Sequence, residues 1–345
     1  MSSKLLDDPR IDPQIKDKFR NFELQPGPNV ASREELLALF AHPVAVAAFE
    51  EEVAFYRSMA PPHDPAWANL DVTTETFSSS PDGNQVNIQY IRPRSGENWP
   101  CVYYIHGGGM LVHSAYMDHY TAWGKIIAAH GVAVAMVDFR NALAPSSAPE
   151  VAPYPAGLND CAAGVAWVRG NAARLGIDAN RIVLSGDSGG GNLALATAMK
   201  LNREGGRKLY SGVYALCPFI AGSWPSPEHP SSTENNGIFL NLHNNQFTYG
   251  YGIEAFEARD PLAWPLFATE ADVKDLPPVV ISVNECDPLR DEGISFYRLL
   301  LRSGVRARCR QVMGTVHGTE VFPSCAPNVS HSTANDIAYF ARSSQ

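Results

Sequence analysis

The chain has 345 residues, of which 45% are hydrophobic and 18% are charged, and its formal net charge at pH 7 is −9. This composition is typical of a well-packed globular protein, and the negative charge argues against nucleic-acid binding, which needs a basic surface stripe. The length exceeds that of an average domain and indicates one large domain with an added cap.

The first ten residues carry two aspartates and no apolar core, so we expect no secretory signal there. No apolar stretch approaches the roughly 20 residues that span a bilayer. The six cysteines are scattered, and Cys101, Cys217 and Cys309 lie within apolar runs, which favours reduced, buried thiols over disulfides. Together these features predict a cytoplasmic protein without a membrane span.

The N-terminal 70 residues predict helices. Apolar positions recur at helical spacing over 34–40 and 44–59, and Ser32 precedes the first of these segments as a candidate N-cap. A proline-rich stretch at 61–65 ends the helical region. Beyond it, residues 86–91 alternate between apolar and polar side chains, which predicts an edge or half-buried strand.

Short, nearly continuous apolar runs then alternate with helix-like segments. Runs of this kind suit parallel strands that are covered on both faces. The strand candidates are 101–105, 132–137, 182–184, 213–216 and 279–283. The helix candidates are 120–130, 157–175, 192–202 and 293–303. The alternation predicts a parallel, doubly wound α/β sheet that binds its ligand at the carboxyl ends of the strands.

Residues 220–270 break this alternation. They are rich in aromatic residues and in Pro, Asn and Ser. An insertion at the carboxyl end of a strand would lie over the ligand site, so we expect 220–270 and the N-terminal residues 1–70 to form a cap. The main α/β domain would then comprise 71–219 and 271–345.

The pentapeptide Gly-Asp-Ser-Gly-Gly at 186–190 lies between a strand candidate at 181–184 and a helix candidate at 192–201. A sharp strand-to-helix turn exposes its serine hydroxyl above the sheet, and flanking glycines let strand and helix pass closely. The pattern therefore predicts that Ser188 is a nucleophile. The same letters surround the nucleophile of chymotrypsin-like proteases, but those β-barrels have no helix after the serine and place the catalytic histidine upstream.

A His-Gly-Gly-Gly run at 106–109 directly follows a strand candidate. Glycines let the backbone approach a ligand closely and point its amides toward it. We expect the amides of Gly107, Gly108 and Gly189 to hold an oxyanion. His106 is expected to brace the loop through hydrogen bonds. A phosphate-binding loop is the alternative, but no Lys-Ser/Thr pair follows the glycines.

A nucleophilic serine needs a base, and the base needs an acid that orients it. Of the histidines that follow Ser188, His317 lies just after a strand candidate at 306–312, from where an imidazole can reach the nucleophile. His317 is the predicted base. The other downstream histidines are expected at the surface, in the cap or near the C-terminus: His229, His243 and His331.

The orienting acid should follow the preceding strand. Asp287 lies in the turn directly after the strand candidate at 279–283 and is the predicted acid. It would hold one tautomer of His317 and stabilise the imidazolium. Acids at the start of the next helix are ordinary helix-terminal features. The neighbouring acids in this segment are Glu285, Asp291 and Glu292.

The motifs HGGG, GDSGGGN, DPLRDEG and VHG occur in this order between residues 106 and 318. In this combination the chain resembles the hormone-sensitive-lipase-like (bacterial family IV) esterases of the α/β-hydrolase fold, over about 72–340. The resemblance implies a mostly parallel sheet flanked by helices, with a helical cap. It also implies a serine carboxylesterase that hydrolyses short- to medium-chain esters through Ser188, His317 and Asp287 and an acyl-enzyme.

The same resemblance implies a small-molecule ester as substrate and neither a metal nor an organic cofactor. It further implies a homodimer that pairs edge strands, for which 306–312 is the candidate strand.

Three features depart from the family pattern. Gly189 stands where alanine is usual, which we interpret as harmless because only its amide is needed. Thr319 stands where an aromatic residue is common, which leaves that wall of the pocket undetermined. The segment that begins at Asp138 is longer and richer in proline than usual, and we interpret Asp138, Arg140 and Asp160 as buried pairs that brace loops.

Two other functions are compatible with parts of the pattern. An amidase or arylformamidase would use the same three residues on a C–N bond, and the cap geometry that decides between the two reactions is not visible in the sequence. Non-catalytic hormone receptors share the fold but lack the histidine, whereas His317 is present here. The sequence therefore predicts a carboxylesterase, with the amidase as the alternative.

Overall fold

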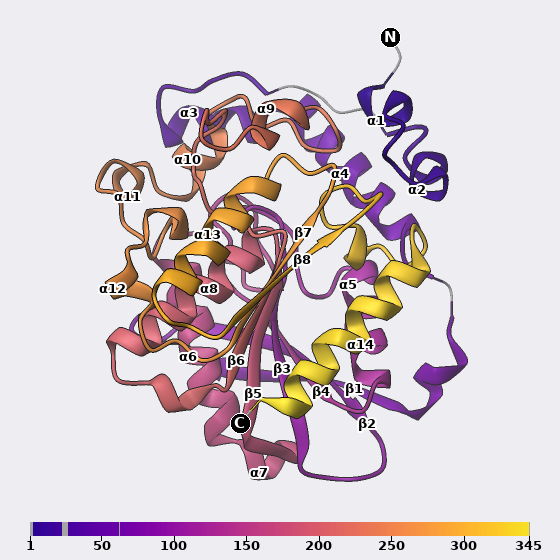
Figure 1. Cartoon of the computed structure of the whole chain (residues 1–345), viewed down its shortest axis with the longest axis vertical. Helices are drawn as coiled ribbons and strands as arrows, with labels where there is room; N and C mark the ends of the chain where they lie inside the picture. Colours follow the sequence, from indigo (N-terminus) through magenta and orange to yellow (C-terminus); the bar gives the residue numbers. More distant parts are fainter. Residues whose placement is uncertain (1–2, 23–26, 62, 345) are drawn as a thin grey trace.

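The computed structural model describes residues 3–22, 27–61 and 63–344. Within these residues, eight strands form one sheet in the order β1-β2-β4-β3-β5-β6-β7-β8 (Figure 1). The strands are β1 (Leu70–Ser78), β2 (Gln85–Pro93), β3 (Trp99–Ile105), β4 (Ala133–Asp138), β5 (Ile177–Asp187), β6 (Gly212–Leu216), β7 (Val279–Asn284) and β8 (Ala307–Val312). Strands β3 to β8 run parallel, β2 is antiparallel to β4, and β1 is antiparallel to β2. The predicted parallel sheet is confirmed.

The strand predicted at 86–91 as an edge or half-buried strand is neither. It belongs to β2, which pairs with β1 on one side and with β4 on the other. Its Ile88 and Ile91 are fully buried. The edge is β1, whose central residues are mostly exposed. β1 is rich in threonine and carries no apolar run, so no clear signal in the sequence indicated that a strand pairs with the outer edge of β2.

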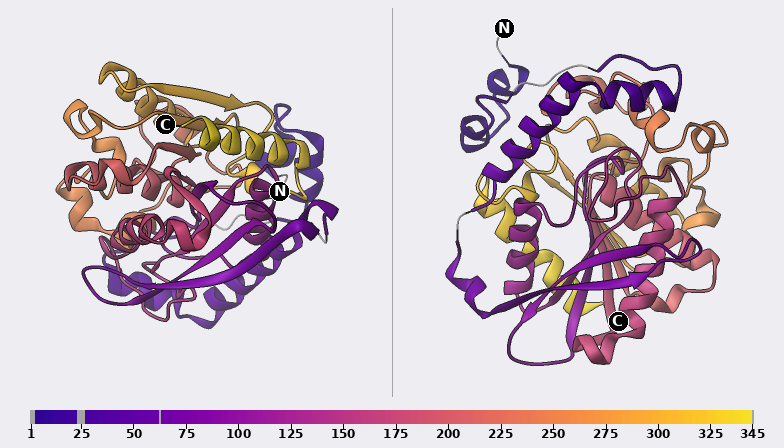
Figure 2. Two further views of the ribbon diagram at one scale, coloured as in Figure 1. Left: turned by 90° about the horizontal axis from the view of Figure 1, so that it is seen from below. Right: turned by 180° about the vertical axis from the view of Figure 1, so that it is seen from behind.

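Helices cover both faces of the sheet (Figure 2). One face packs against α5 (Asp118–Ala129) and α14 (Pro327–Ser343), and the other against α6 (Ala156–Gly170), α7 (Ala172–Leu175), α8 (Gly189–Arg203) and α13 (Arg290–Arg302). Each interface buries its own hydrophobic cluster. The sequence predicted α6 and α7 as one helix and did not predict α14, whose apolar positions alternate with Ser, Asn and Thr.

The remaining α-helices come from two stretches that are far apart in the sequence. One holds α1 (Lys4–Asp7), α2 (Pro13–Lys18), α3 (Arg33–Phe40) and α4 (Pro43–Ser58), and the other holds α9 (Ser231–Glu234), α10 (Gln246–Tyr251), α11 (Ile253–Glu257) and α12 (Glu270–Val273). In Figure 1, α1 to α4 lie with α9 and α10 in the upper part of the view, whereas α11 and α12 lie at its left side, where α12 contacts α8 and α13. Ser32 caps α3 by accepting from the amide of Glu35 at 3.2 Å, as predicted. The Asn245 side chain joins the stretches by accepting from the Val30 amide and donating to its carbonyl, both at 2.8 Å. The cap boundaries stay a prediction.

Buried polar pairs brace the loops around β4. Arg140 donates to Asp160 through Nε at 2.9 Å and through Nη2 at 3.0 Å. Asp138 accepts from the amides of Ala115 and Ser147 at 2.7 and 2.6 Å. The bracing role predicted for these charged residues is confirmed.

No helix in the described ranges is both long and apolar enough to cross a membrane. All six cysteines are free, and all except the half-buried Cys309 are buried.

Candidate active site

Ser188 lies at the turn between β5 and α8. Its backbone has φ 54° and ψ −118°, a strained conformation for a residue with a Cβ. Its amide donates to the carbonyl of Leu216 at 2.9 Å, which ties the turn to β6. A Cβ at Gly190 would collide with the carbonyl oxygen of Ile105, and one at Gly186 with the backbone of Gly190. Strand and helix therefore pass each other closely, and the strained turn presents the serine beyond the sheet.

The three residues predicted as nucleophile, base and acid come together. His317 Nε2 lies 2.8 Å from Ser188 Oγ, and His317 Nδ1 lies 2.8 Å from Asp287 Oδ2. The second carboxylate oxygen of Asp287 accepts from the amide of Leu289 at 2.9 Å, which fixes the carboxylate in the turn after β7. In this geometry a proton can pass from the serine hydroxyl to the imidazole.

The surroundings of His317 make it a stronger base. Burial acts to lower its pKa, but the charge of Asp287 and the hydrogen bond to that carboxylate act in the opposite direction, and the pKa is raised above its ordinary value. The buried carboxylates of Asp187 and Glu320 add to the rise. The raised pKa means that these carboxylates stabilise the imidazolium, the form that His317 would take on accepting a proton from the serine.

The amide of Gly107 already has an internal partner. It donates to the hydroxyl oxygen of Tyr120 at 2.8 Å, so it is not free for an oxyanion, and the expectation for Gly107 is corrected. The amides of Gly108 and Gly109 have no acceptor among the described residues. Gly189 is the first residue of α8, so its amide has no acceptor within its own helix.

His106 lies beneath the glycine loop. Its ring stacks on Phe139 with the centroids 4.4 Å apart, and its Nδ1 lies 2.8 Å from the carbonyl oxygen of Gly107. Burial lowers the pKa of His106 to about 4, which keeps the ring neutral near pH 7. This position suits a residue that braces the loop.

A hydrogen-bonded network that the sequence did not predict lies behind the nucleophile. Asp187 accepts from the hydroxyl of Tyr104 at 2.7 Å and from that of Tyr120 at 3.0 Å. Because Tyr120 also accepts from Gly107, the network links the residue before Ser188 to the glycine loop. The position of Asp187 inside the pentapeptide was the one signal for it. Nothing in the sequence marked the two tyrosines, which come from β3 and α5.

The acids near Asp287 are engaged elsewhere. Glu292 is buried and accepts from the amides of Ile220 and Ala221 at 2.7 and 3.1 Å, and from Trp224 Nε1 at 2.7 Å. Glu292 therefore holds the first residues of the segment between β6 and β7 (the β6–β7 stretch). Its place near the start of α13 did not indicate this role. Asp291 and Glu285 accept from the amides of Ser231 and Gly314.

The structure also places the other downstream histidines and Thr319. His229, predicted at the surface, is buried, with its ring nitrogens 3.1 Å from the hydroxyls of Ser226 and Ser295. His243 and His331 are exposed, as predicted, with His331 on α14. Thr319 is fully buried, and its hydroxyl donates to the carbonyl of Val316 at 2.8 Å, so it forms no wall of the pocket.

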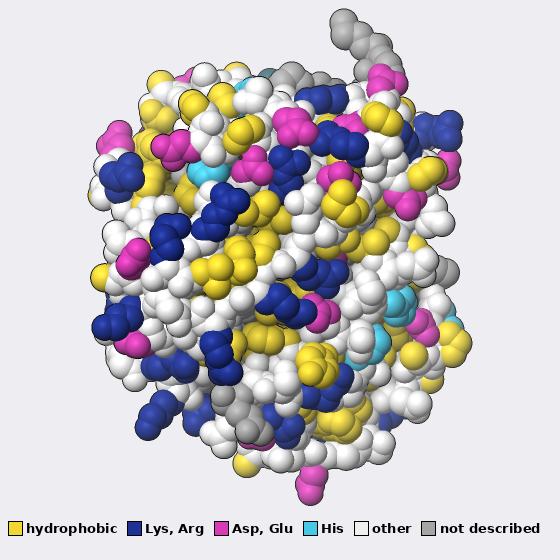
Figure 3. All heavy atoms as spheres, viewed as in Figure 1, with side chains coloured by type: hydrophobic (Ala, Val, Ile, Leu, Met, Phe, Trp, Pro, Cys, Tyr) yellow, Lys and Arg dark blue, Asp and Glu magenta, His cyan; other side chains and the backbone are white. Residues whose placement is uncertain are grey.

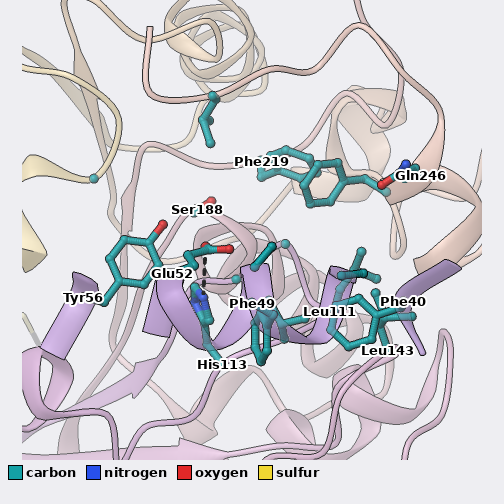
Figure 4. A pocket seen from close by; sticks show the side chains of 18 of the residues that line it. Phe40, Phe49, Glu52, Tyr56, Leu111, His113, Leu143, Ser188, Phe219 and Gln246 are labelled. Atoms are coloured by element: carbon teal, nitrogen blue, oxygen red, sulfur yellow. Dashed lines mark ion pairs between the residues drawn. The ribbon is translucent and has the colours of Figure 1, made fainter. Parts of the chain in front are cut away.

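A cavity of about 850 Å³ lies against Ser188 and His317 (Figure 4). Its walls are mainly apolar and come from the N-terminal helices, the β6–β7 stretch and the loops that follow β3 and β8. The apolar lining includes Leu36, Phe40, Phe49, Leu111, Phe219 and Phe247. This volume lies within the ~300–1,000 Å³ of typical small-molecule sites.

Among the described residues, one cluster has the ligand types and spacing of a metal site: Cys217, Asp287 and His317, with potential ligand atoms within 4.8 Å of one another. The Asp287–His317 pair is already joined by a hydrogen bond. Burial raises the pKa of Cys217 well above its ordinary value, so the thiol keeps its proton, whereas a metal needs the thiolate. The arrangement therefore fits a proton-transfer site better than a metal site.

A mostly parallel sheet with a strained serine between a strand and a helix defines an α/β hydrolase. The family model described as alpha/beta hydrolase fold matches residues 102–321, and the chain belongs to this family. The chain is 32% identical to carboxylesterase NlhH of Mycobacterium tuberculosis over 256 residues, which is 73% of this chain and 76% of the relative. It is 30% identical to an arylesterase of Saccharolobus solfataricus over 262 residues, 75% of this chain and 79% of that protein.

Solved structures place the chain more narrowly. Esterase Est22 is 60% identical, with a TM-score of 0.95, over 98% of this chain and 99% of that one. Another structure of Est22 holds p-nitrophenol. Brefeldin A esterase, a bacterial homologue of human hormone-sensitive lipase, is 35% identical, with a TM-score of 0.89, over 99% of this chain and 95% of that one. The chain is therefore a hormone-sensitive-lipase-like esterase of family IV and a carboxylic ester hydrolase.

Proposed function

We propose that this esterase hydrolyses short- to medium-chain esters through an acyl-enzyme on Ser188, with His317 as the base and Asp287 as the orienting acid. The observation that carries the proposal is the hydrogen-bonded chain through these residues, with 2.8 Å at both links. No other histidine in the described residues lies within hydrogen-bonding distance of Ser188 Oγ.

Acylation begins when Ser188 Oγ attacks the ester carbonyl and its proton passes to His317 Nε2. Asp287 accepts the Nδ1 proton in a hydrogen bond, which leaves Nε2 as the proton acceptor and stabilises the imidazolium. The imidazolium then protonates the leaving alkoxide as the C–O bond breaks, and the acyl group stays on Ser188. A water molecule repeats these steps and releases the acid.

The negative charge on the tetrahedral oxygen needs donors that have no other acceptor. We assign this role to the amides of Gly108, Gly109 and Gly189, and no longer to Gly107, because the Gly107 amide is bonded to Tyr120. The N-terminus of α8 adds a favourable dipole at the Gly189 amide. His106 would brace the loop without transferring a proton.

The size of the substrate follows from the cavity. Its volume of about 850 Å³ and its apolar cap walls suit a small ester with an acyl chain of moderate length. Because a structure of the similar esterase Est22 holds p-nitrophenol, p-nitrophenyl esters are suitable first probes for the present chain.

The direct test is covalent labelling with a p-nitrophenyl organophosphate, followed by peptide mass spectrometry. We expect one phosphoryl group on Ser188, release of p-nitrophenol, and loss of esterase activity in proportion to labelling. Labelling elsewhere, or near wild-type turnover of p-nitrophenyl butyrate by Ser188→Ala, would refute the proposal. A series of acyl chains tests the chain-length claim, which fails if activity holds beyond about twelve carbons. Formyl-anilides in the same panel test the amidase alternative.

Cytoplasmic location and homodimerisation stay predictions. The candidate strand, β8, is one of the two edge strands of the described sheet, opposite β1, and Met313 just beyond it is 64% exposed. Figure 3 shows hydrophobic side chains reaching the surface between charged ones on this face of the molecule. A sedimentation experiment on the purified chain would decide the assembly state.

A further inference from the structure

One wall of the cavity carries charge that the hydrolytic mechanism does not use. Glu52 on α4 and His113 in the loop after the glycine run both line the cavity, with Glu52 Oε1 3.7 Å from His113 Nε2. The His113 ring lies beside the glycine loop, because a Cβ on Gly108 would come within 2.9 Å of His113 Nδ1. Figure 4 shows Glu52 paired with His113 across the cavity wall, with Phe40 and Leu143 at the other side of this view. The cavity therefore has a polar group beside the loop of the proposed oxyanion donors and an apolar wall elsewhere.

Glu52 Oε1 and His113 Nε2 are 3.7 Å apart, which is too long for a hydrogen bond. The His113 side chain is only 9% exposed, and neither of its ring nitrogens has a hydrogen-bond partner among the described residues. The Glu52 side chain is 39% exposed, so its carboxylate is the accessible member of the pair. Burial acts to raise the pKa of Glu52, but the neighbouring His113 and Tyr56 side chains act in the opposite direction, and the pKa is lowered, so the group is anionic near pH 7.

The charge of this wall is not neutralised by a basic side chain from elsewhere in the cavity. The described lining includes Glu51 and Glu52 but no lysine or arginine. An ionised carboxylate beside an apolar wall accepts hydrogen bonds strongly and repels a second anion. A substrate group placed there gains from an O–H or N–H donor and loses from a negative charge.

Resting on the proposed ester hydrolysis, we propose that Glu52 determines specificity by selecting esters that carry a hydrogen-bond donor near the scissile bond and by rejecting esters that carry a carboxylate. His113 is a positioning residue, which acts on the substrate only through Glu52 because it is the more buried member of the pair. The two sources of such a donor are a neutral hydroxyl and a protonated amine, and both share the chemistry that Glu52 recognises.

The test compares four butyrate esters by pH-stat titration: ethyl, 2-hydroxyethyl, 2-(dimethylamino)ethyl and carboxymethyl butyrate. A parallel acyl series uses the p-nitrophenyl esters of butyric acid, 3-hydroxybutyric acid and succinic acid (as the monoester). The variants are wild type, Glu52→Gln, and Glu50→Gln as the matched control. Glu50 is a carboxylate on the same helix that does not line the cavity.

The readout is a ratio of kcat/KM values within one variant, which is independent of the folded fraction. In wild type we expect the carboxylate ester to fall at least about tenfold below its neutral counterpart in at least one series, and the donor esters to exceed it. Glu52→Gln should raise the relative rate of the carboxylate ester by about tenfold and lower that of the amine ester, whereas Glu50→Gln should leave both ratios unchanged.

The hydroxyl and amine arms distinguish the sources of the donor. A loss of preference in Glu52→Gln confined to the amine ester assigns the site to cations, and a loss for both assigns it to donors in general. Ratios that are the same in wild type, Glu52→Gln and Glu50→Gln overturn the inference while ester hydrolysis itself stands. Failure of wild type to hydrolyse any of the esters would instead refute the proposed function.

Discussion

Replacing Gly189 with alanine tests how tightly the nucleophile turn and the glycine loop are fitted together. The resemblance described in the sequence analysis implies alanine at this position, and the sequence alone indicated that glycine there is harmless. In the structure, a Cβ on Gly189 would lie 2.6 Å from the amide nitrogen of Met110 and 2.8 Å from that of Gly109. Both neighbours are backbone atoms, so no flexible side chain can move aside to make room.

The size of the effect follows from these distances. Ordinary van der Waals contact begins near 3.4 Å, so the closest backbone atom must retreat from 2.6 to 3.4 Å, which is about 0.8 Å. The Gly109 amide, one of the proposed oxyanion donors, must retreat from 2.8 Å along with its neighbour Met110. A misplacement of about 1 Å can cost about 10²-fold in rate, so we expect kcat to fall by about 10- to 100-fold. KM should change less, because an oxyanion donor acts mainly in the transition state.

The assay is steady-state hydrolysis of p-nitrophenyl butyrate, with thermal unfolding measured in parallel. Gly170→Ala is the matched control, because a Cβ on Gly170, the last residue of α6, meets nothing within 4 Å. That variant should keep the wild-type kcat. A Gly189→Ala enzyme with kcat within about twofold of wild type would contradict the reasoning, since the loop would then have space that the structure does not show.

Three other perturbations test separate parts of the site and the fold. The acid limb of the kcat/KM profile against pH should have its midpoint above pH 6.5, because His317 must be neutral to act as a base and its pKa is raised. Asp287→Asn should move that midpoint to lower pH. An unmoved midpoint would contradict the assignment of Asp287. Tyr120→Phe removes the acceptor of the Gly107 amide and should lower kcat by about tenfold. Tyr104→Phe also loses a hydrogen bond to Asp187 but does not touch the loop, so it should lower kcat less. Equal losses of kcat in the two variants would show that the link to Gly107 is unimportant. Asp160→Ala leaves the buried Arg140 guanidinium without its principal partner and should reduce the free energy of unfolding in urea by about 3–5 kcal/mol, whereas Asp17→Ala, which breaks a solvent-exposed pair with Arg20, should change it little.

The parts of the fold that could be predicted from the sequence are those in which local pattern and burial coincide. The runs at 133–137 and 279–283 are apolar almost without interruption because β4 and β7 are buried on both faces, and a strand with one solvent-facing side would alternate instead. The order of Ser188, Asp287 and His317 could be predicted because the connections of a parallel sheet bring its strand ends to one edge.

What escaped prediction depends on partners that are distant in the sequence. β2 is covered by β1, which is polar enough to look like a loop, and α14 buries a narrow stripe that includes Ile337 and Ala341 among polar residues. His229 is buried because Ser226 and Ser295 satisfy both of its ring nitrogens. No local pattern signals that a polar side chain will find such partners.

The glycine loop shows why a motif can be recognised while its individual residues are misassigned. In the sequence the three glycines are equivalent, but each is needed for a different reason. A Cβ on Gly107 would lie 2.8 Å from the hydroxyl oxygen of Tyr120, whereas Gly108 and Gly109 have φ values of 103° and 61° that residues with a Cβ rarely adopt. The turn at positive φ redirects the amides after Gly107 away from Tyr120.

The loop and the nucleophile turn are therefore one unit. Asp187, which precedes Ser188, holds Tyr120, and Tyr120 holds the first glycine of the loop. Gly189, which follows Ser188, lets the next two glycines approach. A change on either side of the nucleophile should therefore be felt first in the stabilisation of the oxyanion and only second in the reactivity of the serine. This order predicts that Gly189→Ala and Tyr120→Phe still react with an organophosphate, but with rates reduced in step with their kcat, because phosphorylation uses the same loop.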